Sequence, residues 1–170
     1  MREIFSFPRT INEKAARVVA GVVALTALAA LLTDARWLLV PLAYGFWARV
    51  LTGPTLSPLG RLASQVVAPR LGEPKTVSGP PKRFAQAMGA AMTTAGAVAA
   101  LGFGADGVAD ALLVALLAAA TLEAVFAYCL GCKIFGLLMR TGVIPDAICA
   151  ECADIWSRPG MTAGRPASSR

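Results

Sequence analysis

Residues 15–32 carry the sequence AARVVAGVVALTALAALL, and this stretch decides the fold class. Its single charged residue is Arg17, close to the start, and the remaining residues are apolar or small. A helix needs about 20 residues to cross the hydrocarbon core of a bilayer. The stretch is therefore predicted to be a transmembrane helix.

Three further apolar stretches follow, over residues 37–51, 84–104 and 111–139. The first of these is short for a span, and we expect its helix to extend over a few polar residues at each end. The last is too long for one span, so we expect a helix that crosses the bilayer to about Cys129, then a break, then an interfacial segment. The sequence thus predicts an all-α integral membrane bundle of four transmembrane helices over residues 1–140.

The composition agrees with a membrane protein and excludes several other classes. Hydrophobic residues make up 56% of the chain and charged residues 15%, whereas about a quarter of the residues in a soluble domain are charged. A net charge of +6 is a feature that nucleic-acid-binding proteins also have. However, the basic residues flank the apolar stretches instead of forming a basic domain, which argues against a nucleic-acid partner. The lipid bilayer is the partner that the composition indicates.

The charges in the loops predict the topology. Basic residues cluster before the first span, between the second and third spans, and after the fourth, while the loop between the third and fourth spans holds only Asp106 and Asp110. Because basic loops stay in the cytoplasm, we expect a multi-pass protein of the cytoplasmic (inner) membrane with both termini cytoplasmic. The tail, residues 157–170, is rich in Pro, Gly, Ser, Ala and Arg and is expected to be disordered. Four short spans make a small monomer, so we also expect a homodimer or a larger partner.

Two local signals mark helix starts. Thr10 with Glu13 has the spacing of a capping box before the first span. Ser57 followed by Pro58 is typical of an N-cap and a first helical residue. We therefore expect a short interfacial helix in the cytoplasmic loop between spans two and three, ending at Pro69.

The four cysteines form two CxxC pairs, Cys129 with Cys132 and Cys149 with Cys152, and the chain has no histidine. Sixteen residues separate the pairs. This spacing matches a four-cysteine zinc site, in which two CxxC motifs hold one tetrahedral ion. The second pair falls in residues 141–156, which we expect to be a cytoplasmic segment. One interpretation is therefore a structural Zn²⁺ site made by all four cysteines, with iron the less favoured metal.

The second interpretation of the cysteines is thiol chemistry. Cys129 and Cys132 would be the working dithiol, and Cys149 and Cys152 the resolving pair. If the helix breaks between the first two cysteines, Cys132 lies at the start of the next helix, where the dipole and the following lysine lower a thiol pKa. If the helix continues, the thiols lie at its C-terminal end, where a metal is needed to hold them deprotonated. A third interpretation is four inert thiols, which the pairing argues against. Stable disulfides are disfavoured in a reducing compartment.

A carboxylate and a guanidinium fall inside predicted spans. A charged residue in a span is costly and is a functional hypothesis by default. Counted from Asp110, Glu123 lies about 20 Å from the outer face. Counted from Trp37, Arg49 lies about 18 Å from it. We expect an intramembrane ion pair of Arg49 and Glu123. Either the pair only fixes the helix register, with Arg49 able to reach the interface, or Glu123 accepts protons from the thiols, about 9 Å from Cys129 along the axis.

Several short motifs occur together in this chain, the most specific being PPKRFA at residues 80–85 and CLGC at residues 129–132. The others are Ile11-Asn12-Glu13 with Arg17, Gly45-Phe46 with Arg49, Gly53-Pro54, Ser57-Pro58 and Leu122-Glu123. Over residues 8–140 this pattern resembles the bacterial DUF4395 family of small membrane proteins of unassigned function. The resemblance implies an association with thioredoxin-like or sulfurtransferase proteins, and hence thiol or sulfur chemistry without a particular reaction. The resemblance also strengthens the hypothesis that Arg49 and Glu123 are important in this protein.

We therefore expect a membrane-embedded thiol protein that handles redox equivalents or sulfur at the cytoplasmic face through its two CxxC pairs. Its expected partner is a thioredoxin-like or sulfurtransferase protein. The alternative is a non-catalytic membrane protein whose four cysteines hold structural Zn²⁺, the one cofactor that the sequence suggests. Transport or channel activity has only Glu123 in its favour.

Overall fold

The computed structural model describes residues 10–53, 56–70, 72 and 75–144. The described chain is almost entirely helical, so the predicted all-α class is confirmed. Three helices have the length and apolar composition to cross a membrane, as expected of a membrane protein. They are α1 (Glu13–Leu32), α5 (Gly79–Ala97) with its continuation through the π-helical turn η3 (Val98–Gly102), and α6 (Asp106–Phe126).

The second predicted span is a shorter helix, α2 (Leu39–Thr52), which follows the 3₁₀ turn η1 (Arg36–Leu38). Fourteen helical residues extend over about 21 Å, whereas the hydrocarbon core is about 30 Å thick. Three of the four expected spans therefore reach a spanning length. The outward face of α2 is nevertheless apolar, with Val40, Tyr44 and Leu51 exposed.

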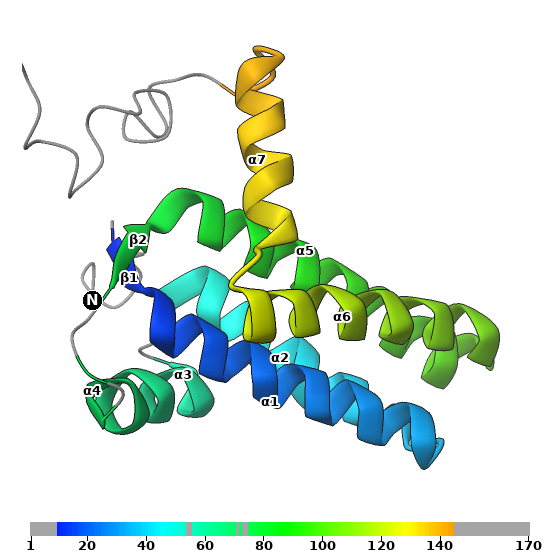
Figure 1. Ribbon diagram of the computed structural model, residues 1–170. Helices are drawn as coiled ribbons and strands as arrows, with labels where there is room; N and C mark the ends of the chain where they lie inside the picture. Colours follow the sequence, from blue (N-terminus) through cyan, green and yellow to red (C-terminus); the bar gives the residue numbers. More distant parts are fainter. Residues whose placement is uncertain (1–9, 54–55, 71, 73–74, 145–170) are drawn as a thin grey trace, which may run out of the picture.

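The remaining described elements are short and lie at one end of the bundle (Figure 1). They are, in chain order, β1 (Thr10–Asn12), α3 (Pro58–Leu62), the π-helical turn η2 (Ala63–Val67), α4 (Ala68–Arg70), β2 (Thr76–Ser78) and α7 (Leu130–Arg140). The two strands pair antiparallel, with Ile11 opposite Val77. This pairing ties the chain before α1 to the chain before α5.

The bundle is built from two helix pairs, α1 with α6 and α2 with α5, lying side by side (Figure 1). One core joins them, and its members are mostly Ala, Val and Leu. Small residues allow the closest contacts, because helices in lipid are held by packing more than by the hydrophobic effect. At Gly89 of α5, a Cβ atom would lie 2.3 Å from the ring of Phe46 on α2.

The start of α1 differs from the prediction. Asn12 is the N-cap, and its side chain accepts a hydrogen bond from the Lys14 amide at 3.0 Å. The expected capping box of Thr10 and Glu13 is therefore wrong. Thr10 belongs to β1, and Glu13 is the first helical residue, paired with Lys75 at 3.0 Å. The physical reason is that strand pairing with β2 fixes Thr10 in an extended conformation two residues before the cap.

A helical segment, α3–η2–α4, occupies the positions of the predicted interfacial helix and packs against α1 and α2 (Figure 1). Its cap is the predicted one, since the Ser57 hydroxyl accepts a hydrogen bond from the Gly60 amide at 3.1 Å and Pro58 is the first helical residue. The predicted end is close. Pro69 lies inside the last turn, and the helix runs to Arg70. Proline has no N–H to donate within a helix, and the π-helical turn lies directly before it.

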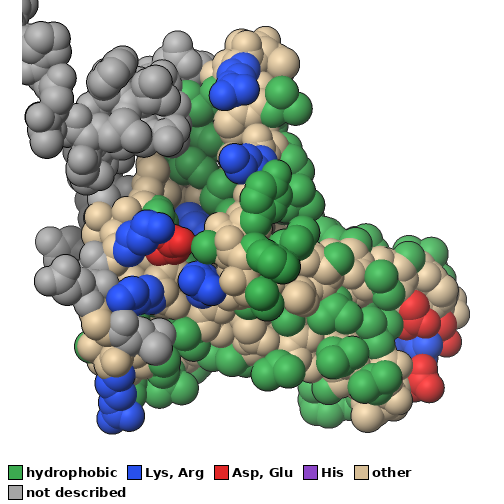
Figure 2. All heavy atoms as spheres, in the orientation of Figure 1, with side chains coloured by type: hydrophobic (Ala, Val, Ile, Leu, Met, Phe, Trp, Pro, Cys, Tyr) green, Lys and Arg blue, Asp and Glu red, His purple; other side chains and the backbone are tan. Residues whose placement is uncertain are grey.

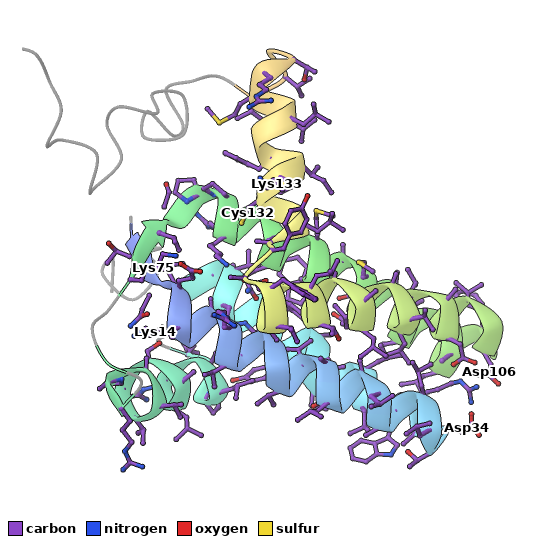
Figure 3. The ribbon with its side chains drawn as sticks, in the orientation of Figure 1. Lys14, Asp34, Lys75, Asp106, Cys132 and Lys133 are labelled. Atoms are coloured by element: carbon purple, nitrogen blue, oxygen red, sulfur yellow. The ribbon has the colours of Figure 1, made fainter. Side chains whose placement is uncertain are left out.

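The two ends of the bundle differ in charge. Figure 2 shows mainly Lys and Arg side chains, with an acidic side chain among them, at the end that holds the strands and along α7, and acidic side chains around a basic one at the opposite end. At that opposite end, Arg36 pairs with Asp110 at 3.0 Å and with Asp106 at 3.3 Å. Asp34 and Asp106 lie there together (Figure 3). The ion pairs hold the connection between α1 and α2 against the start of α6.

Candidate functional site

A helix break brings the first cysteine pair to the start of a helix. α6 ends at Phe126, and Ala127 adopts a left-handed conformation with φ of 55°. Cys129 is then extended and forms the N-cap of α7, whose first residue is Leu130. The chain turns there, and α7 runs transverse to the bundle (Figure 1). The predicted break near Cys129 is confirmed, and both cysteines lie at a helix N-terminus because the break precedes both.

Arg17 of α1 holds the end of α6 at this break. Its Nε donates to the Ala124 carbonyl and its Nη2 to the Val125 carbonyl, each at 3.0 Å. The last carbonyls of a helix have no partner within it, and a cation there is favourable. Sequence reasoning counted Arg17 as a flanking charge and as part of a family motif, and missed this role. The family motif that contains Arg17 was the only sequence signal for this role, because no local pattern predicts a contact between Arg17 and Ala124, which are 107 residues apart.

The structure places Cys129 and Cys132 together as free thiols, Cys129 buried and Cys132 partly buried. Cys132 lies where α7 meets the bundle, next to Lys133 (Figure 3). The other predicted metal ligands, Cys149 and Cys152, lie outside the described residues. Within residues 10–53, 56–70, 72 and 75–144, no group of three or more Cys, His, Asp or Glu side chains is arranged to hold a metal ion.

The two thiols differ in acidity. Hydrogen-bond interaction with the Cys132 thiol lowers the pKa of Cys129, and the nearby Lys82 lowers it further, against the opposing effects of burial and Glu123. The same interaction with Cys129 and the burial of the thiol raise the pKa of Cys132. A helix N-terminus and a nearby cation are the features that favour a thiolate. Of the two, Cys129 is therefore the more acidic thiol.

The carboxylate of Glu123 on α6 pairs with Lys82 on α5 and not directly with Arg49. The side chains of Lys82 and Glu123 are mostly shielded, at 9% and 16% exposure. The structure thus gives Glu123 an ion-pair partner other than the predicted Arg49. Lys82 was counted only as a loop charge because it comes directly after the Pro80-Pro81 motif. Those prolines in fact form the first turn of α5, which carries Lys82 into the bundle.

Arg49 of α2 is buried beside this ion pair, near enough for its charge to interact with that of Glu123. Its Nε donates to Gln86 Oε1 at 2.7 Å, and its Nη1 donates to Ser57 Oγ at 3.4 Å. The guanidinium also lies over the Phe46 ring, 4.7 Å from its centre. Among the described residues, Arg49 forms no direct ion pair. The buried site therefore contains two cations and one carboxylate before any thiol ionises.

α7 packs on α5 through a close contact between a glycine and an alanine. A Cβ atom at Gly131 would lie 2.6 Å from the Ala85 Cβ and 2.7 Å from the Ala85 Cα. Further along, Phe135 packs against Phe84 with ring centres 5.7 Å apart. Gly131 lies between the two cysteines, so the contact that positions the helix also positions the thiols.

A cavity of about 170 Å³ lies inside the bundle next to this site. Residues from α1, α2, α5, α6 and α7 line it. The lining is apolar apart from one wall of three side chains, Arg49, Gln86 and Glu123. The segment between the two cysteines, Leu130 and Gly131, borders the same cavity.

The chain matches one family model, described as a domain of unknown function (DUF4395), over residues 11–140. The chain belongs to the DUF4395 family. This confirms the resemblance drawn from the sequence. The range matched to DUF4395 contains the bundle, the Lys82–Glu123 pair and the Cys129–Cys132 pair, and ends before Cys149. No curated protein and no solved structure matches the chain.

Proposed function

We propose that this DUF4395 protein is a membrane-embedded dithiol protein that handles redox equivalents or sulfur at the cytoplasmic face through Cys129 and Cys132. The observation that carries the proposal is the position of the pair. Cys129 is the N-cap of α7 and Cys132 lies in its first turn. A dithiol at a helix N-terminus, beside a buried cation, has the environment of a reactive thiol and not of an inert one.

The proposed reaction is thiol–disulfide exchange. The Cys129 thiolate attacks a disulfide of the partner, forming a mixed disulfide and releasing one partner thiolate. Cys132 then loses its proton and attacks the Cys129 sulfur, releasing the second partner thiolate and leaving a Cys129–Cys132 disulfide. Two electrons pass from the dithiol to the partner. In the sulfur-transfer version, the Cys129 thiolate attacks the outer sulfur of a persulfide on the partner, so that the partner's S–S bond breaks, its thiolate leaves, and Cys129 carries the transferred sulfur as a persulfide.

Lys82 and Glu123 are positioning residues in this proposal. Lys82 lies close enough to Cys129 for its charge to favour the thiolate. Glu123 neutralises Lys82 and gives the proton of Cys132 an acceptor. Arg49 adds a second cation, so that a Cys129 thiolate brings the buried charges into balance. A buried charge without compensation is costly, so this balance supports the ionised thiol.

We further propose four spans, with η1 and α2 together forming the second, in the cytoplasmic membrane. The basic end, with α3–α4 and α7, would face the cytoplasm, and the Arg36 cluster would face the opposite side. Support comes from the positive-inside rule and from the transverse course of α7, which suits a membrane surface (Figure 1). A thioredoxin-like or sulfurtransferase partner would then meet the dithiol from the cytoplasm, and a homodimer remains part of the proposal.

Trapping the mixed disulfide tests the exchange reaction. In a chain carrying Cys149→Ser and Cys152→Ser, the added Cys132→Ser should accumulate a mixed disulfide with a soluble aromatic disulfide, because the resolving thiol is gone. The matched Cys129→Ser should react much more slowly. Intact-mass spectrometry counts the adducts. Equal reaction of the two variants, or none in either, would contradict the assignment of Cys129 as the nucleophile.

The spacing of the two CxxC pairs favours structural zinc as a second candidate function. That site needs Cys149 and Cys152, which lie beyond the range matched to the family. Metal analysis of the purified, chelator-free protein decides between the candidates. About one zinc per chain that disappears in Cys149→Ser would establish the structural site and remove the dithiol proposal.

A further inference from the structure

We propose that the bundle cavity binds the head group of a single-ring membrane quinone, which accepts the electrons of the dithiol. The inference rests on the proposed function, because it names the electron acceptor for Cys129 and Cys132. Four features of the cavity support quinone binding: its size, its polar wall, its opening and its place beside the thiols.

The cavity has the size of one six-membered ring. Its volume is about 170 Å³, and an apolar protein cavity of about 150 Å³ is known to bind benzene. Its walls include Val23, Met92 and Leu116, which suit an uncharged ring and offer nothing to a small hydrated ion. The bulk of the occupant should therefore be apolar.

The polar wall of the cavity suits a quinone oxygen, which accepts a hydrogen bond as a carbonyl in the oxidised ring and donates one as a hydroxyl in the reduced ring. Arg49 is a buried donor on this wall, and the carboxylate of Glu123 on the same wall is paired with Lys82. A guanidinium donates to a quinone carbonyl, and a carboxylate accepts from the hydroxyl of the reduced ring. A carboxylate ligand would also be attracted by Arg49, but it would be repelled by Glu123 on the same wall. A neutral carbonyl avoids that repulsion.

The cavity has a lining residue on the outside of the bundle, and it extends to the two residues between the cysteines, although neither cysteine lines it. Ala115 lines it and is also exposed on the surface of α6, which gives an apolar tail a way out to lipid. On another side the cavity is bordered by Leu130 and Gly131, the two residues between the cysteines. A quinone in the cavity would therefore lie next to the pair that it oxidises.

The reaction balances with the quinone as oxidant. The two S–H bonds of Cys129 and Cys132 break, and one S–S bond forms between them. The two electrons and two protons pass to the quinone, which leaves as hydroquinone. The Cys129–Cys132 disulfide is reduced again when the proposed exchange runs in the reverse direction, with a partner dithiol as the electron donor, so electrons pass from that partner to the membrane quinone pool.

Two measurements on the detergent-solubilised chain test the inference. Binding of a short-chain benzoquinone is measured by equilibrium dialysis on the Cys129→Ser/Cys132→Ser variant, which cannot turn over. Oxidation is measured on the reduced wild-type chain, by quinone absorbance and by the loss of free thiols. We expect saturable binding, and one quinone reduced for each dithiol lost.

A matched pair of alanines on α6 locates the binding site. Ala119 lines the cavity, and its neighbour Ala118 is exposed on the outside of the bundle. Ala119→Leu should fill the cavity and raise the Kd of the quinone about tenfold or more, whereas Ala118→Leu should leave the Kd unchanged. Equal effects of the two substitutions, or no effect of either, would overturn the cavity as the site.

The outcomes separate this inference from the proposed function. If the wild-type thiols exchange with a soluble disulfide but the quinone neither binds nor oxidises them, the inference fails and the dithiol function stands. If the quinone binds and the thiols exchange with nothing, the electron-transfer step and the dithiol function both fail.

Discussion

At the residue scale, the environment of Cys129 is set by charges of opposite sign on two neighbouring helices. The interaction with Cys132 has the largest influence on the pKa of Cys129 and lowers it. Burial and Glu123 raise this pKa, whereas Lys82 lowers it. Lys82 and Glu123 are themselves paired. Removing either partner should therefore expose the effect of the other on the thiol.

Lys82→Met and Glu123→Gln should shift the acidity of Cys129 in opposite directions. Loss of the cation raises the pKa of Cys129, so alkylation by iodoacetamide, which needs the thiolate, moves to higher pH. Loss of the carboxylate lowers the pKa and moves alkylation to lower pH. The pH profile of alkylation, in a chain with Cys149→Ser and Cys152→Ser, measures both shifts.

Lys75→Met is the control for these variants, because Lys75 is exposed and pairs with Glu13 at the edge of the bundle. Its pH profile should match that of the parent chain. Shifts of the same sign in the Lys82 and Glu123 variants would show that the ion pair acts on the thiol through the fold and not through charge.

The sequence predicted which residues matter at this site better than it predicted their partners. Depth counting placed Arg49 and Glu123 at similar levels, and the two charges do interact. It did not find Lys82, because two prolines before it suggested a loop, whereas they form the first turn of α5. Two cations at one depth compete for one carboxylate, and only the packing of α5 against α6 decides between them.

At the element scale, α7 is held by its close approach to α5. Gly131→Ala should place a methyl group 2.7 Å from the backbone Cα of Ala85. Overpacking of this kind destabilises a protein by about 1–3 kcal/mol, and here it should also displace the dithiol. Thermal unfolding in detergent measures the loss of stability.

Gly136→Ala, on the same helix, is the matched control. A Cβ atom there meets nothing within 4 Å. Replacing such a glycine should leave the stability unchanged or raise it by about 0.4–1 kcal/mol, because alanine restricts the unfolded chain. Similar destabilisation by both substitutions would contradict the assigned role of the Gly131–Ala85 contact.

The end of α6 depends on Arg17. Arg17→Met should remove two charge-assisted hydrogen bonds to carbonyls at the C-terminus of α6 and lower the stability by about 1–3 kcal/mol. Hydrogen exchange should accelerate at the amides near Ala127 before it does elsewhere. Arg61→Met, at an exposed position of α3, is the control. Unchanged exchange in the Arg17 variant would argue against its capping role.

Most of the helices followed from the sequence, whereas the pairing of β1 with β2 and the short length of α2 did not. The break after α6 was predicted from length, because an apolar run of 29 residues exceeds the about 20 that cross a bilayer. The left-handed Ala127 that makes the break has no signal of its own, since this conformation usually falls on glycine. The Thr10–Glu13 cap failed because strand pairing across 66 residues decided the start of α1.

At the scale of the whole molecule, charge is divided between the two ends of an apolar bundle (Figure 2). This division predicts the orientation in the membrane. In a chain without its native cysteines, Gly107→Cys at the acidic end should react with an impermeant maleimide added to intact spheroplasts. Ser64→Cys, in the segment at the basic end, should react only after permeabilisation. The reverse labelling pattern would invert the proposed topology.

The central claim is that Cys129 and Cys132 form a reversible redox pair. The most direct test is an equilibrium titration of the Cys149→Ser/Cys152→Ser chain against a glutathione buffer, followed by acid quenching, alkylation and intact-mass spectrometry. The account predicts one reversible two-electron transition between a doubly alkylated dithiol and an unalkylated Cys129–Cys132 disulfide. Two thiols that stay reduced across the whole range of potentials, or that oxidise one at a time to glutathione adducts, would contradict it.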